Sequence, residues 1–403
     1  MKSGTGTDRN QTTKWSRQTQ MVRAGSMRSE MGEMSEALFL TSGFAYENAE
    51  EAEARFDGRA TGFTYSRQSN PTVAMFEERM ALLEGADIGR ATGTGMAAMT
   101  AALLAGLSAG DHVLGARALF GSCRWLMDTL LPRYGIETTV IDGTDLGAWK
   151  AAVQPNTKMF FAETPANPTL EIVDLRAVAD LAHENGARLV VDNVFATPVL
   201  QRPKEQGADI VCYSTTKHID GQGRCLGGVI LCDKDWDEEF LYPFYRHTGC
   251  AMSPFNAWIM LKGLETLGLR VHAMCDNAEK LAHAIAGKLS DVRHPILENF
   301  KQRDLAFSQM ERGGTMVAFE LPGGRDQAFQ FMNALEIVDI SNNLGDSRSI
   351  ATHPWSTTHK ALSEDIRLEL GITPGLIRLS VGLEGADDLI GDIVQALAMA
   401  GAK

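Results

Sequence analysis

From about residue 73 onward, the sequence alternates amphipathic helical stretches with short runs of apolar and β-branched residues. The helical stretches include residues 73–83 and 175–185, and Gly186 follows the second at a position that suits a left-handed helix cap. The runs expected to form strands are residues 112–114, 138–141, 158–162, 189–191, 210–213 and 229–231. This alternation predicts an α/β fold with a large, mainly parallel sheet covered by helices.

The alternation ends near residue 254, and the rest of the chain has a different pattern. Residues 255–289 carry Leu, Met and Ala at helical spacing, which predicts one long connecting helix. Beyond it, residues 316–321 and 376–381 are expected to be strands and residues 386–400 a final helix. Because a single core stops growing at roughly 250 to 300 residues, a chain of 403 residues should divide. We expect an N-terminal arm at 1–62, a large domain at 63–254, and a connecting helix with a smaller C-terminal α/β domain at 255–403.

Charge and cysteine usage exclude several classes of protein. The formal net charge of -13 would repel a phosphate backbone, and no long run of Lys and Arg offsets it, so nucleic acid is not an expected partner. The six cysteines lie far apart without zinc-site spacing, which fits reduced thiols in a cytoplasmic protein and predicts no metal site. The basic N-terminal segment has no apolar run and is not a secretory signal. No apolar stretch is long enough to cross a bilayer, so no membrane partner is expected.

Three of the predicted strands are followed by unusual polar segments. In open parallel sheets, ligands bind at the carboxyl ends of the strands, so these segments form a candidate site. The segments are, in chain order, Glu163-Thr164-Pro165-Ala166-Asn167-Pro168-Thr169, Asp192-Asn193 and Ser214-Thr215-Thr216-Lys217-His218. An acid, an amide and an amine are therefore expected to converge on one edge of the sheet.

Asp192 and Lys217 indicate the chemistry of this edge. Asp192 follows an apolar, β-branched run, so its carboxylate should be poorly hydrated and should need a cationic partner. That partner is either an arginine in a salt bridge or the protonated pyridine nitrogen of a cofactor. Lys217 follows a buried strand, where desolvation favours the neutral amine that forms Schiff bases, although most strand-end lysines are solvated. Ser214 and Thr216 can donate hydroxyl hydrogen bonds to a phosphate, and the combination favours a cofactor.

A glycine-containing segment provides a candidate phosphate site. Gly93-Thr94-Gly95-Met96 opens an Ala-rich helix and presents free backbone N–H groups at the positive end of the helix dipole. The spacing Gly93-x-Gly95-x-x-Ala98 also resembles a dinucleotide fingerprint. That fingerprint requires a hydrophobic strand directly before it, and residues 85–90 are a poor strand candidate. A nicotinamide-dependent dehydrogenase is therefore disfavoured.

Several short motifs follow one another in a characteristic order along the chain. They are Tyr65-Ser66-Arg67, Asn70-Pro71-Thr72, Thr94-Gly95-Met96, Asn167-Pro168-Thr169, Asp192-Asn193, Ser214-Thr215-Thr216-Lys217 and Arg378-Leu379-Ser380-Val381-Gly382. From about residue 60 to the C-terminus, the chain resembles the trans-sulfuration family of pyridoxal-phosphate enzymes of cysteine and methionine metabolism. The resemblance implies an aspartate-aminotransferase-like fold (fold type I), with pyridoxal 5'-phosphate as the cofactor.

The resemblance also implies roles for individual residues. Lys217 would be the catalytic residue and would carry the cofactor as a Schiff base, while Asp192 holds the ring nitrogen protonated and Asn167 hydrogen-bonds the ring oxygen. The residues that would hold the phosphate are Gly95, Met96, Ser214 and Thr216. Tyr65 and Arg67 would reach the phosphate of the neighbouring subunit. The family therefore implies an obligate dimer, usually doubled to a tetramer built as a dimer of dimers.

Two further motifs narrow the expected reaction. Leu119-Phe120-Gly121-Ser122-Cys123-Arg124-Trp125 and Asn343-Leu344-Gly345-Asp346 look most like the branch that exchanges the succinyl group of O-succinylhomoserine for sulfide, giving homocysteine and succinate. The alternatives left open are cystathionine γ-synthase, an enzyme that uses the O-acetyl ester, and a γ-lyase acting on methionine or cystathionine. A non-catalytic regulator on the same fold is a remote alternative, because the N-terminal region contains no convincing DNA-binding helical module.

The amino-acid substrate has its own expected contacts. By the same resemblance, Arg378 would bind the substrate α-carboxylate through a bidentate pair, with Ser349 nearby. Most relatives carry a tyrosine where this chain has Phe120, which can stack on the cofactor but has no hydroxyl, so proton transfer must use Lys217 or water. This departure weakens a lyase assignment. We hypothesise that Arg124, just beyond Phe120, binds the succinyl carboxylate.

Overall fold

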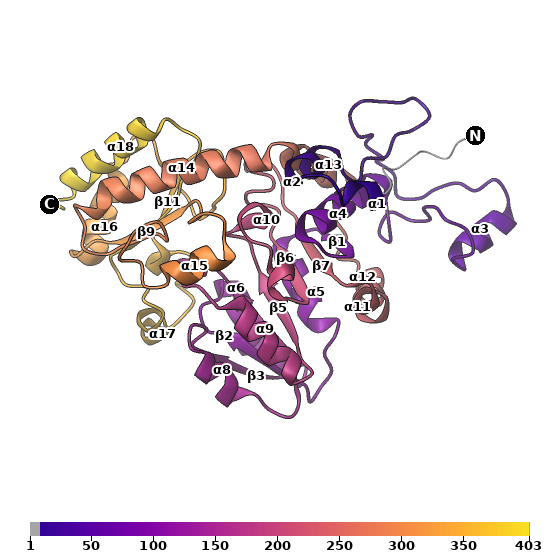
Figure 1. The fold of residues 1–403 in the computed structure, drawn as a ribbon, viewed down its shortest axis with the longest axis horizontal. Coiled ribbons are helices and arrows are strands. Elements are labelled where there is room, and N and C mark those ends of the chain that lie inside the picture. The colour runs from indigo at the N-terminus through magenta and orange to yellow at the C-terminus, as the bar shows by residue number, and fades with distance from the viewer. Residues whose placement is uncertain (1–8, 403) are drawn as a thin grey trace. The chain divides into compact units, whose positions relative to one another are not determined.

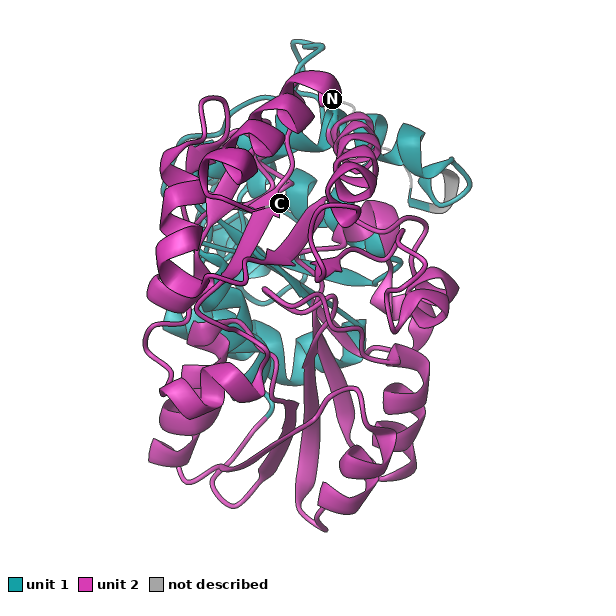
Figure 2. Ribbon diagram, turned by 90° about the vertical axis from the view of Figure 1, so that its left-hand side faces the viewer, with its two compact units in different colours: residues 1–106, 212–216, 224–266 teal, residues 107–211, 217–223, 267–403 magenta. Residues whose placement is uncertain are grey.

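The computed structural model describes residues 9–402 of the chain (Figure 1). Internal contacts define two compact units, unit 1 and unit 2, coloured teal and magenta in Figure 2. Unit 1 comprises Met1–Gly106, Cys212–Thr216 and Arg224–Thr266, and unit 2 comprises Leu107–Val211, Lys217–Gly223 and Leu267–Lys403. The predicted division into 1–62, 63–254 and 255–403 cuts the chain into consecutive segments, whereas each unit combines segments that are far apart in the sequence. The predicted boundaries stay a prediction.

Helix α4 (Pro71–Glu84) is the main buried helix of unit 1. The side chain of Asn70 caps its N-terminus by accepting from the N–H of Thr72, and Gly85 ends it in a left-handed conformation with φ 80°. The predicted helix at 73–83 is therefore confirmed. The other described helices of unit 1 are α1 (Arg9–Thr12), α2 (Arg17–Arg23), α3 (Ala49–Phe56), α5 (Gly95–Leu104), α11 (Lys234–Trp236), α12 (Tyr242–Thr248) and α13 (Pro254–Glu265), with a π-helical turn at Asp237–Leu241.

The expectation that residues 85–90 are a poor strand is wrong. Strand β1 (Ile88–Thr92) lies there and pairs antiparallel with β7 (Gly228–Cys232), so that Gly89 is opposite Leu231. The dinucleotide fingerprint follows a parallel strand, and β1 is antiparallel to its partner. The presence of a strand therefore does not restore the dehydrogenase interpretation.

Tertiary contacts explain why a glycine and an arginine are tolerated in β1. A Cβ atom at Gly89 would lie 2.6 Å from the carbonyl oxygen of Glu77, so only glycine allows this close approach to α4. The guanidinium of Arg90 donates from Nε to Oδ1 of Asp237 at 2.8 Å, which pairs its charge. Strand propensity depends on the local sequence, so it does not predict either of these contacts.

The parallel strands of unit 2 are β2, β3, β4 and β5, in the spatial order β5-β4-β2-β3. Their bounds are His112–Ala116, Glu137–Ile141, Thr157–Glu163 and Arg188–Asp192. With β6 (Ile210–Tyr213), they belong to a seven-stranded sheet of order β1-β7-β6-β5-β4-β2-β3. The six strands predicted from the alternating pattern are all confirmed, as is the mainly parallel sheet.

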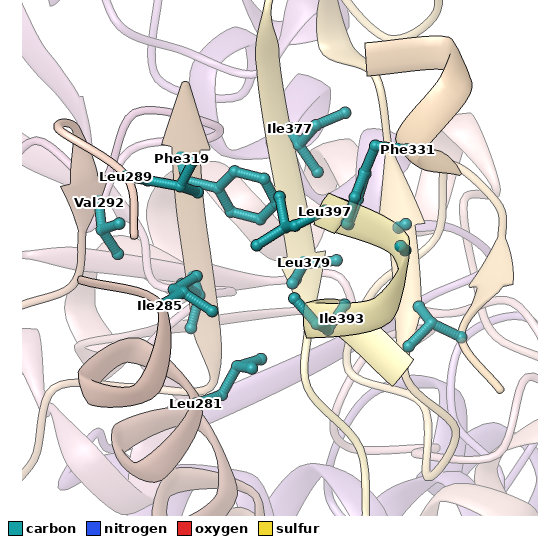
Figure 3. Close-up of a cluster of buried hydrophobic side chains, with 14 of the residues drawn as sticks. Leu281, Ile285, Leu289, Val292, Phe319, Phe331, Ile377, Leu379, Ile393 and Leu397 are labelled. Carbon is teal, nitrogen blue, oxygen red and sulfur yellow. The ribbon is translucent and has the colours of Figure 1, made fainter. Parts of the chain in front are cut away.

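A second sheet lies in the C-terminal part of unit 2, with the strand order β10-β11-β12-β9-β8. Its strands are β8 (Val292–Arg293), β9 (Met316–Glu320), β10 (Asp339–Ile340), β11 (Ile350–Thr352) and β12 (Leu376–Ser380). Figure 3 shows side chains of α14 (Leu267–Ala286) and α18 (Ala386–Met399), including Ile285 and Ile393, packed with Phe319 of β9 in one apolar core. The predicted strands at 316–321 and 376–381 and the final helix are confirmed.

The prediction of one continuous connecting helix over 255–289 is wrong. Helix α13 ends at Glu265 with Thr266 as its C-cap, and α14 starts at Leu267. Thr266 has left the helical conformation, with φ -113° and ψ 3°, and its N–H bonds to the carbonyl of Gly263. A β-branched residue close to two glycines weakens a helix at this point, although the apolar spacing continues across it.

The remaining α-helices of unit 2 are short, apart from α9 and α16, which have ten residues each. They are α6 (Gly121–Trp125), α7 (Leu131–Arg133), α8 (Leu146–Ala152), α9 (Leu175–Glu184), α10 (Thr197–Leu200), α15 (Arg303–Gln309), α16 (Gly324–Asn333) and α17 (Glu364–Glu369). Gly186 follows α9 with φ 67°, as its predicted left-handed position requires. Within residues 9–402, no helix has the length and apolar character needed to cross a membrane.

Candidate active site

Lys217 follows strand β6 and is partly buried. Its Nζ donates a hydrogen bond to Oδ1 of Asn343 at 2.6 Å. Burial, followed by the positive charge of Arg378, lowers the pKa of Lys217 to about 8, while the carboxylate of Asp192 acts in the opposite direction. An amine with this pKa is neutral in a large fraction of molecules near pH 8, and the neutral amine is the nucleophilic form.

Asp192 and Glu163 are two buried carboxylates at the ends of neighbouring strands. They occupy the same register of the parallel pair β4 and β5. Burial raises the pKa of both, and the charge of Asp192 raises the pKa of Glu163 further. Asp192 accepts a hydrogen bond from the N–H of Val194 at 3.1 Å, but no described Lys or Arg forms an ion pair with it. It can therefore accept a further, positively charged donor.

Arg378 lies on β12 and is only 1% exposed. Its Nη1 donates to Oδ1 of Asn167 at 2.8 Å, and its Nη2 donates to the carbonyl of Asn343 at 2.9 Å and to the hydroxyl of Thr352 at 3.0 Å. Its Nε is buried without a hydrogen-bond partner among the described residues. Burial lowers the pKa of Arg378 to about 10, and the carboxyl group of Glu163 opposes the shift. The Nε–H of Arg378 can therefore donate a hydrogen bond to a bound anion.

Asn343 links two of the predicted site residues and had no predicted contact of its own. Its side chain accepts from Lys217 and its main-chain carbonyl accepts from Arg378. The loop can come this close because Gly345 has φ 69° and a Cβ there would lie 2.6 Å from the main-chain nitrogen of His218. In the sequence, Asn343 stands out only as part of the Asn343-Leu344-Gly345-Asp346 motif, which indicates a branch of the family but not a contact with Lys217 or Arg378.

Phe120 is the N-cap of α6, the first described helix of unit 2, and Arg124 lies in the last turn of the same helix. The N–H of Phe120 donates to Oε2 of Glu163 at 2.5 Å, which ties this segment to the end of β4. The guanidinium of Arg124 donates from Nε to Oδ2 of Asp128 at 2.7 Å, and the Arg124 side chain is 12% exposed. Arg124 is therefore not a solvent-facing arginine, and an incoming carboxylate would compete with Asp128 for it.

Ser349 is a buried residue whose hydroxyl forms two hydrogen bonds within the protein. It donates to Oε2 of Glu384 at 2.8 Å and accepts from the N–H of Gly382 at 2.8 Å. These contacts hold two chain segments together. A direct contact between this hydroxyl and a substrate stays a prediction.

The predicted phosphate-binding residues lie in unit 1. Thr94 caps α5 by accepting from the N–H of Ala97 at 3.0 Å, so the N–H groups of the first turn, from Gly95 and Met96 onward, are at the helix N-terminus. A Cβ at Gly95 would lie 2.5 Å from Cβ of Ser214, which places Gly95 against Ser214.

Thr216, the last residue before Lys217, forms two hydrogen bonds within unit 1. Its hydroxyl donates to the carbonyl of Gly227 at 3.2 Å and accepts from the N–H of Gly227 at 3.0 Å. These bonds fix the turn that leads into Lys217. A further bond from Thr216 to a phosphate stays a prediction.

Tyr65 and Arg67 are exposed residues of unit 1. The guanidinium of Arg67 lies over the Tyr65 ring, 5.4 Å from its centroid, and donates from Nη1 to the carbonyl of Arg246. A charged group and an aromatic ring held together at the surface are accessible to another molecule.

Comparison with known proteins identifies the family. Residues 18–398 match the family described as Cys/Met metabolism PLP-dependent enzyme, in which PLP is pyridoxal phosphate. The chain belongs to this family. It is 48% identical over 382 residues, 93% of the chain and 94% of the relative, to an O-succinylhomoserine sulfhydrylase of Mycobacterium tuberculosis. An enzyme of the same name from Pseudomonas aeruginosa is 46% identical over 94% of each chain. An L-methionine gamma-lyase of Pseudomonas putida is 39% identical over 91% of this chain and 93% of its own.

Solved structures of family members share the fold. A cystathionine gamma synthase of Xanthomonas oryzae pv. oryzae has a TM-score of 0.92 at 33% identity, covering 96% of this chain and 99% of its own. A Campylobacter jejuni structure assigned as an O-acetylhomoserine (thiol)-lyase, which carries a pyridoxyl-lysine phosphate, has a TM-score of 0.91 at 30% identity, covering 95% of this chain and 100% of its own. The predicted fold and the predicted cofactor are thereby confirmed.

The residues present fit pyridoxal phosphate. In unit 2, Asp192 is a buried carboxylate without a cationic ion-pair partner among the described residues, and Lys217 is an amine with a lowered pKa. In unit 1, the lack of a side chain at Gly95 lets Ser214 lie directly against the N-terminus of α5. A carboxylate for the ring nitrogen, an amine for the aldehyde and N–H groups for the phosphate are the contacts that this cofactor requires.

Proposed function

We propose that the protein catalyses a γ-replacement in which sulfide displaces succinate from O-succinylhomoserine and homocysteine is released. The observation that carries the proposal is the hydrogen-bonded group of Lys217, Asn343 and Arg378, which sets a partly neutral amine beside an arginine with a spare donor. The names of the relatives at 46–48% identity support the choice of substrate.

Three residues would contact the cofactor ring. Asp192 would keep the ring nitrogen protonated, because a buried carboxylate is stabilised by a cation. Asn167 uses its Oδ1 for Arg378, so its amide nitrogen is left to donate to the ring oxygen. Phe120 would stack on the ring. When bound, pyridoxal phosphate accepts the electron pair that is left on the substrate when the α-proton departs.

Lys217 would move the protons of the reaction. Its pKa near 8 lets the amine take the α-proton and return a proton later within the same pH range. Phe120 offers no hydroxyl for this task. Asn343 would keep the amine in place through the 2.6 Å hydrogen bond.

Substrate binding would depend on arginines. The unpartnered Nε of Arg378, together with one of its Nη groups, would bind the α-carboxylate of the amino acid. Arg124 would bind the succinyl carboxylate in exchange for Asp128. An Arg124→Ala variant should lower the specificity constant for the succinyl ester, and an unchanged constant would remove Arg124 from the proposal.

We also propose that the working enzyme is a tetramer built as a dimer of dimers. In a dimer, the exposed Tyr65 and Arg67 would reach the phosphate bound by the neighbouring subunit. The phosphate contacts of Gly95, Met96, Ser214 and Thr216 would come from the subunit that carries Lys217. Light scattering on the cofactor-loaded protein should give the mass of four chains, and mixing an Arg67→Ala variant with a Lys217→Ala variant should restore some activity through mixed dimers.

The test of the proposed reaction is a product assay with competing sulfur donors. The purified holoprotein receives O-succinylhomoserine or the O-acetyl ester with sulfide, with cysteine, or with neither, and a separate sample receives methionine alone. Homocysteine, cystathionine, succinate and 2-oxobutyrate are quantified. We expect homocysteine and succinate in equal amounts with sulfide, and a lower specificity constant for the O-acetyl ester. Cystathionine as the main product would instead assign the γ-synthase reaction, and 2-oxobutyrate from methionine would assign a lyase.

A further inference from the structure

The side chain of Glu163 joins two segments that carry predicted cofactor contacts. Its Oε2 accepts from the N–H of Phe120 at 2.5 Å and its Oε1 accepts from the N–H of Asn167 at 2.9 Å. Both donors are main-chain groups outside regular helix and strand hydrogen bonding. Because each carboxylate oxygen serves one amide, the distance between the two segments is set by a single side chain.

Glu163 also connects to the substrate end of the site. Asn167, whose N–H it accepts, uses its own Oδ1 to accept from Arg378 at 2.8 Å. The positive charge of Arg378 favours the ionised form of Glu163, against burial and against the negative charge of Asp192. The chain of contacts therefore runs from Phe120 through Glu163 and Asn167 to Arg378.

Glu163 is a buried carboxyl group beside a second buried carboxyl group, an arrangement that does not stabilise a core by packing alone. Glu163 is 5% exposed and stands in register with Asp192 on the adjacent strand. Placing two acidic groups together in a poorly hydrated environment is unfavourable unless strong donors compensate. The two main-chain donors and Arg378 act against this cost, but the pKa of Glu163 stays well above its ordinary value because burial and the charge of Asp192 have the larger effect. All three groups belong to segments that carry the predicted site residues.

We propose that Glu163 is a positioning residue, which holds the ring of Phe120 and the amide of Asn167 at the separation that the bound cofactor needs. The inference rests on the proposed function in that it assigns a role within the same site. Glu163 itself touches neither substrate nor cofactor in this proposal. Its effect should appear in how the cofactor is held and in how the substrate carboxylate is bound.

The test compares three variants of the holoprotein. Glu163→Gln keeps the size of the side chain but turns an NH2 group toward one main-chain N–H, so one of the two hydrogen bonds is lost. Glu163→Asp keeps the carboxyl group but is too short to reach both amides. Glu171→Gln is the matched control, because Glu171 is also a partly buried glutamate with a raised pKa, and its side chain forms no hydrogen bond with the described residues.

Three measurements are made on each variant. Thermal unfolding reports whether the fold is intact, and circular dichroism of the visible cofactor band reports how the ring is held. Steady-state kinetics separate kcat from KM. We expect Glu163→Gln to bind one cofactor per chain with an altered visible band, and its kcat/KM to fall about tenfold or more, through both kcat and KM. Glu171→Gln should match the wild type in all three.

One combined result would overturn the inference. A wild-type visible band and a kcat/KM within about twofold of wild type in Glu163→Gln would mean that Glu163 only fills space. If that variant does not fold, Glu163→Asp decides by the same criteria. The visible band needs no substrate, so an altered band in a protein without sulfhydrylase activity would support the positioning role and reject only the proposed reaction.

Discussion

The amine of Lys217 lies 2.6 Å from Oδ1 of Asn343, and the main-chain carbonyl of the same asparagine lies 2.9 Å from Nη2 of Arg378. One residue therefore contacts both the proposed proton carrier and the proposed carboxylate-binding residue. The side chain serves the lysine and the main chain serves the arginine. Because the two contacts use different parts of Asn343, a side-chain substitution separates them.

Replacing Asn343 with alanine should affect proton transfer more than substrate binding. The Asn343→Ala variant loses the hydrogen bond to Lys217 but keeps the carbonyl that holds Arg378, so kcat should fall about tenfold while KM changes little. Steady-state kinetics with O-succinylhomoserine and sulfide provide the measurement. Asn342→Ala is the control, because that side chain is exposed, and it should behave as wild type. A rise in KM with an unchanged kcat would contradict this division of roles.

Replacing Arg378 with lysine should weaken substrate binding. Lysine keeps the positive charge but cannot replace both the hydrogen bond to Asn167 and a bidentate pair with a carboxylate, so kcat/KM should fall about 100-fold, mainly through KM. Arg293→Lys, on strand β8 of the same sheet, should have little effect. An Arg378→Lys variant with an unchanged KM would show that the α-carboxylate binds elsewhere.

The rate of cofactor attachment should depend on the pKa of Lys217. Attachment requires the neutral amine, and burial lowers this pKa from 10.5 to about 8. Below pH 8 the rate should therefore rise about tenfold per pH unit, and above it the rate should level off. Stopped-flow absorbance on apoprotein mixed with pyridoxal phosphate measures this profile. A rate that keeps rising to pH 10 would indicate a solvated lysine.

The ion pairs of Glu36 should stabilise the fold in a pH-dependent way. Burial acts to raise the pKa of Glu36, but hydrogen bonds from Lys262 and Arg79 lower it from 4.5 to about 2. The resulting stabilisation is fully present above about pH 4.5 and is lost as the pH falls toward 2. A Glu36→Gln variant should lose about 3 kcal/mol of unfolding free energy at neutral pH, and the difference should shrink in acid.

Chemical denaturation at several pH values measures this effect. Glu53→Gln is the control, because the Glu53 and Arg59 side chains are 71% and 58% exposed and such pairs contribute little. If Glu36→Gln and Glu53→Gln had equal effects, the buried network would not stabilise the protein.

Local pattern was sufficient to predict the parallel sheet and the residues at its strand ends. Asp192, Asn167 and Lys217 each directly follow or lie close to the end of an apolar run, and the carboxyl ends of parallel strands meet at one edge. The family motifs then supplied Arg378, which is far away in the sequence. Each of these residues could be predicted because either the strand pattern or a known motif gives its position.

Contacts between distant segments could not be predicted in the same way. Asn343 is 126 residues from Lys217, and its loop approaches because Gly345 allows it. Glu163 was recognised at a strand end, but its bond to the N–H of Phe120, 43 residues away, depends on the folded chain. The break at Thr266 was hidden by apolar spacing that continues across it.

The most direct test of the proposed function is to locate the lysine that binds the cofactor. The holoprotein is reduced with borohydride, digested and analysed by mass spectrometry, with a Lys217→Ala variant treated in parallel. We expect a pyridoxyl-phosphate adduct on Lys217 and none on the variant. An adduct on a different lysine, or none on the wild-type protein after incubation with excess pyridoxal phosphate, would contradict it.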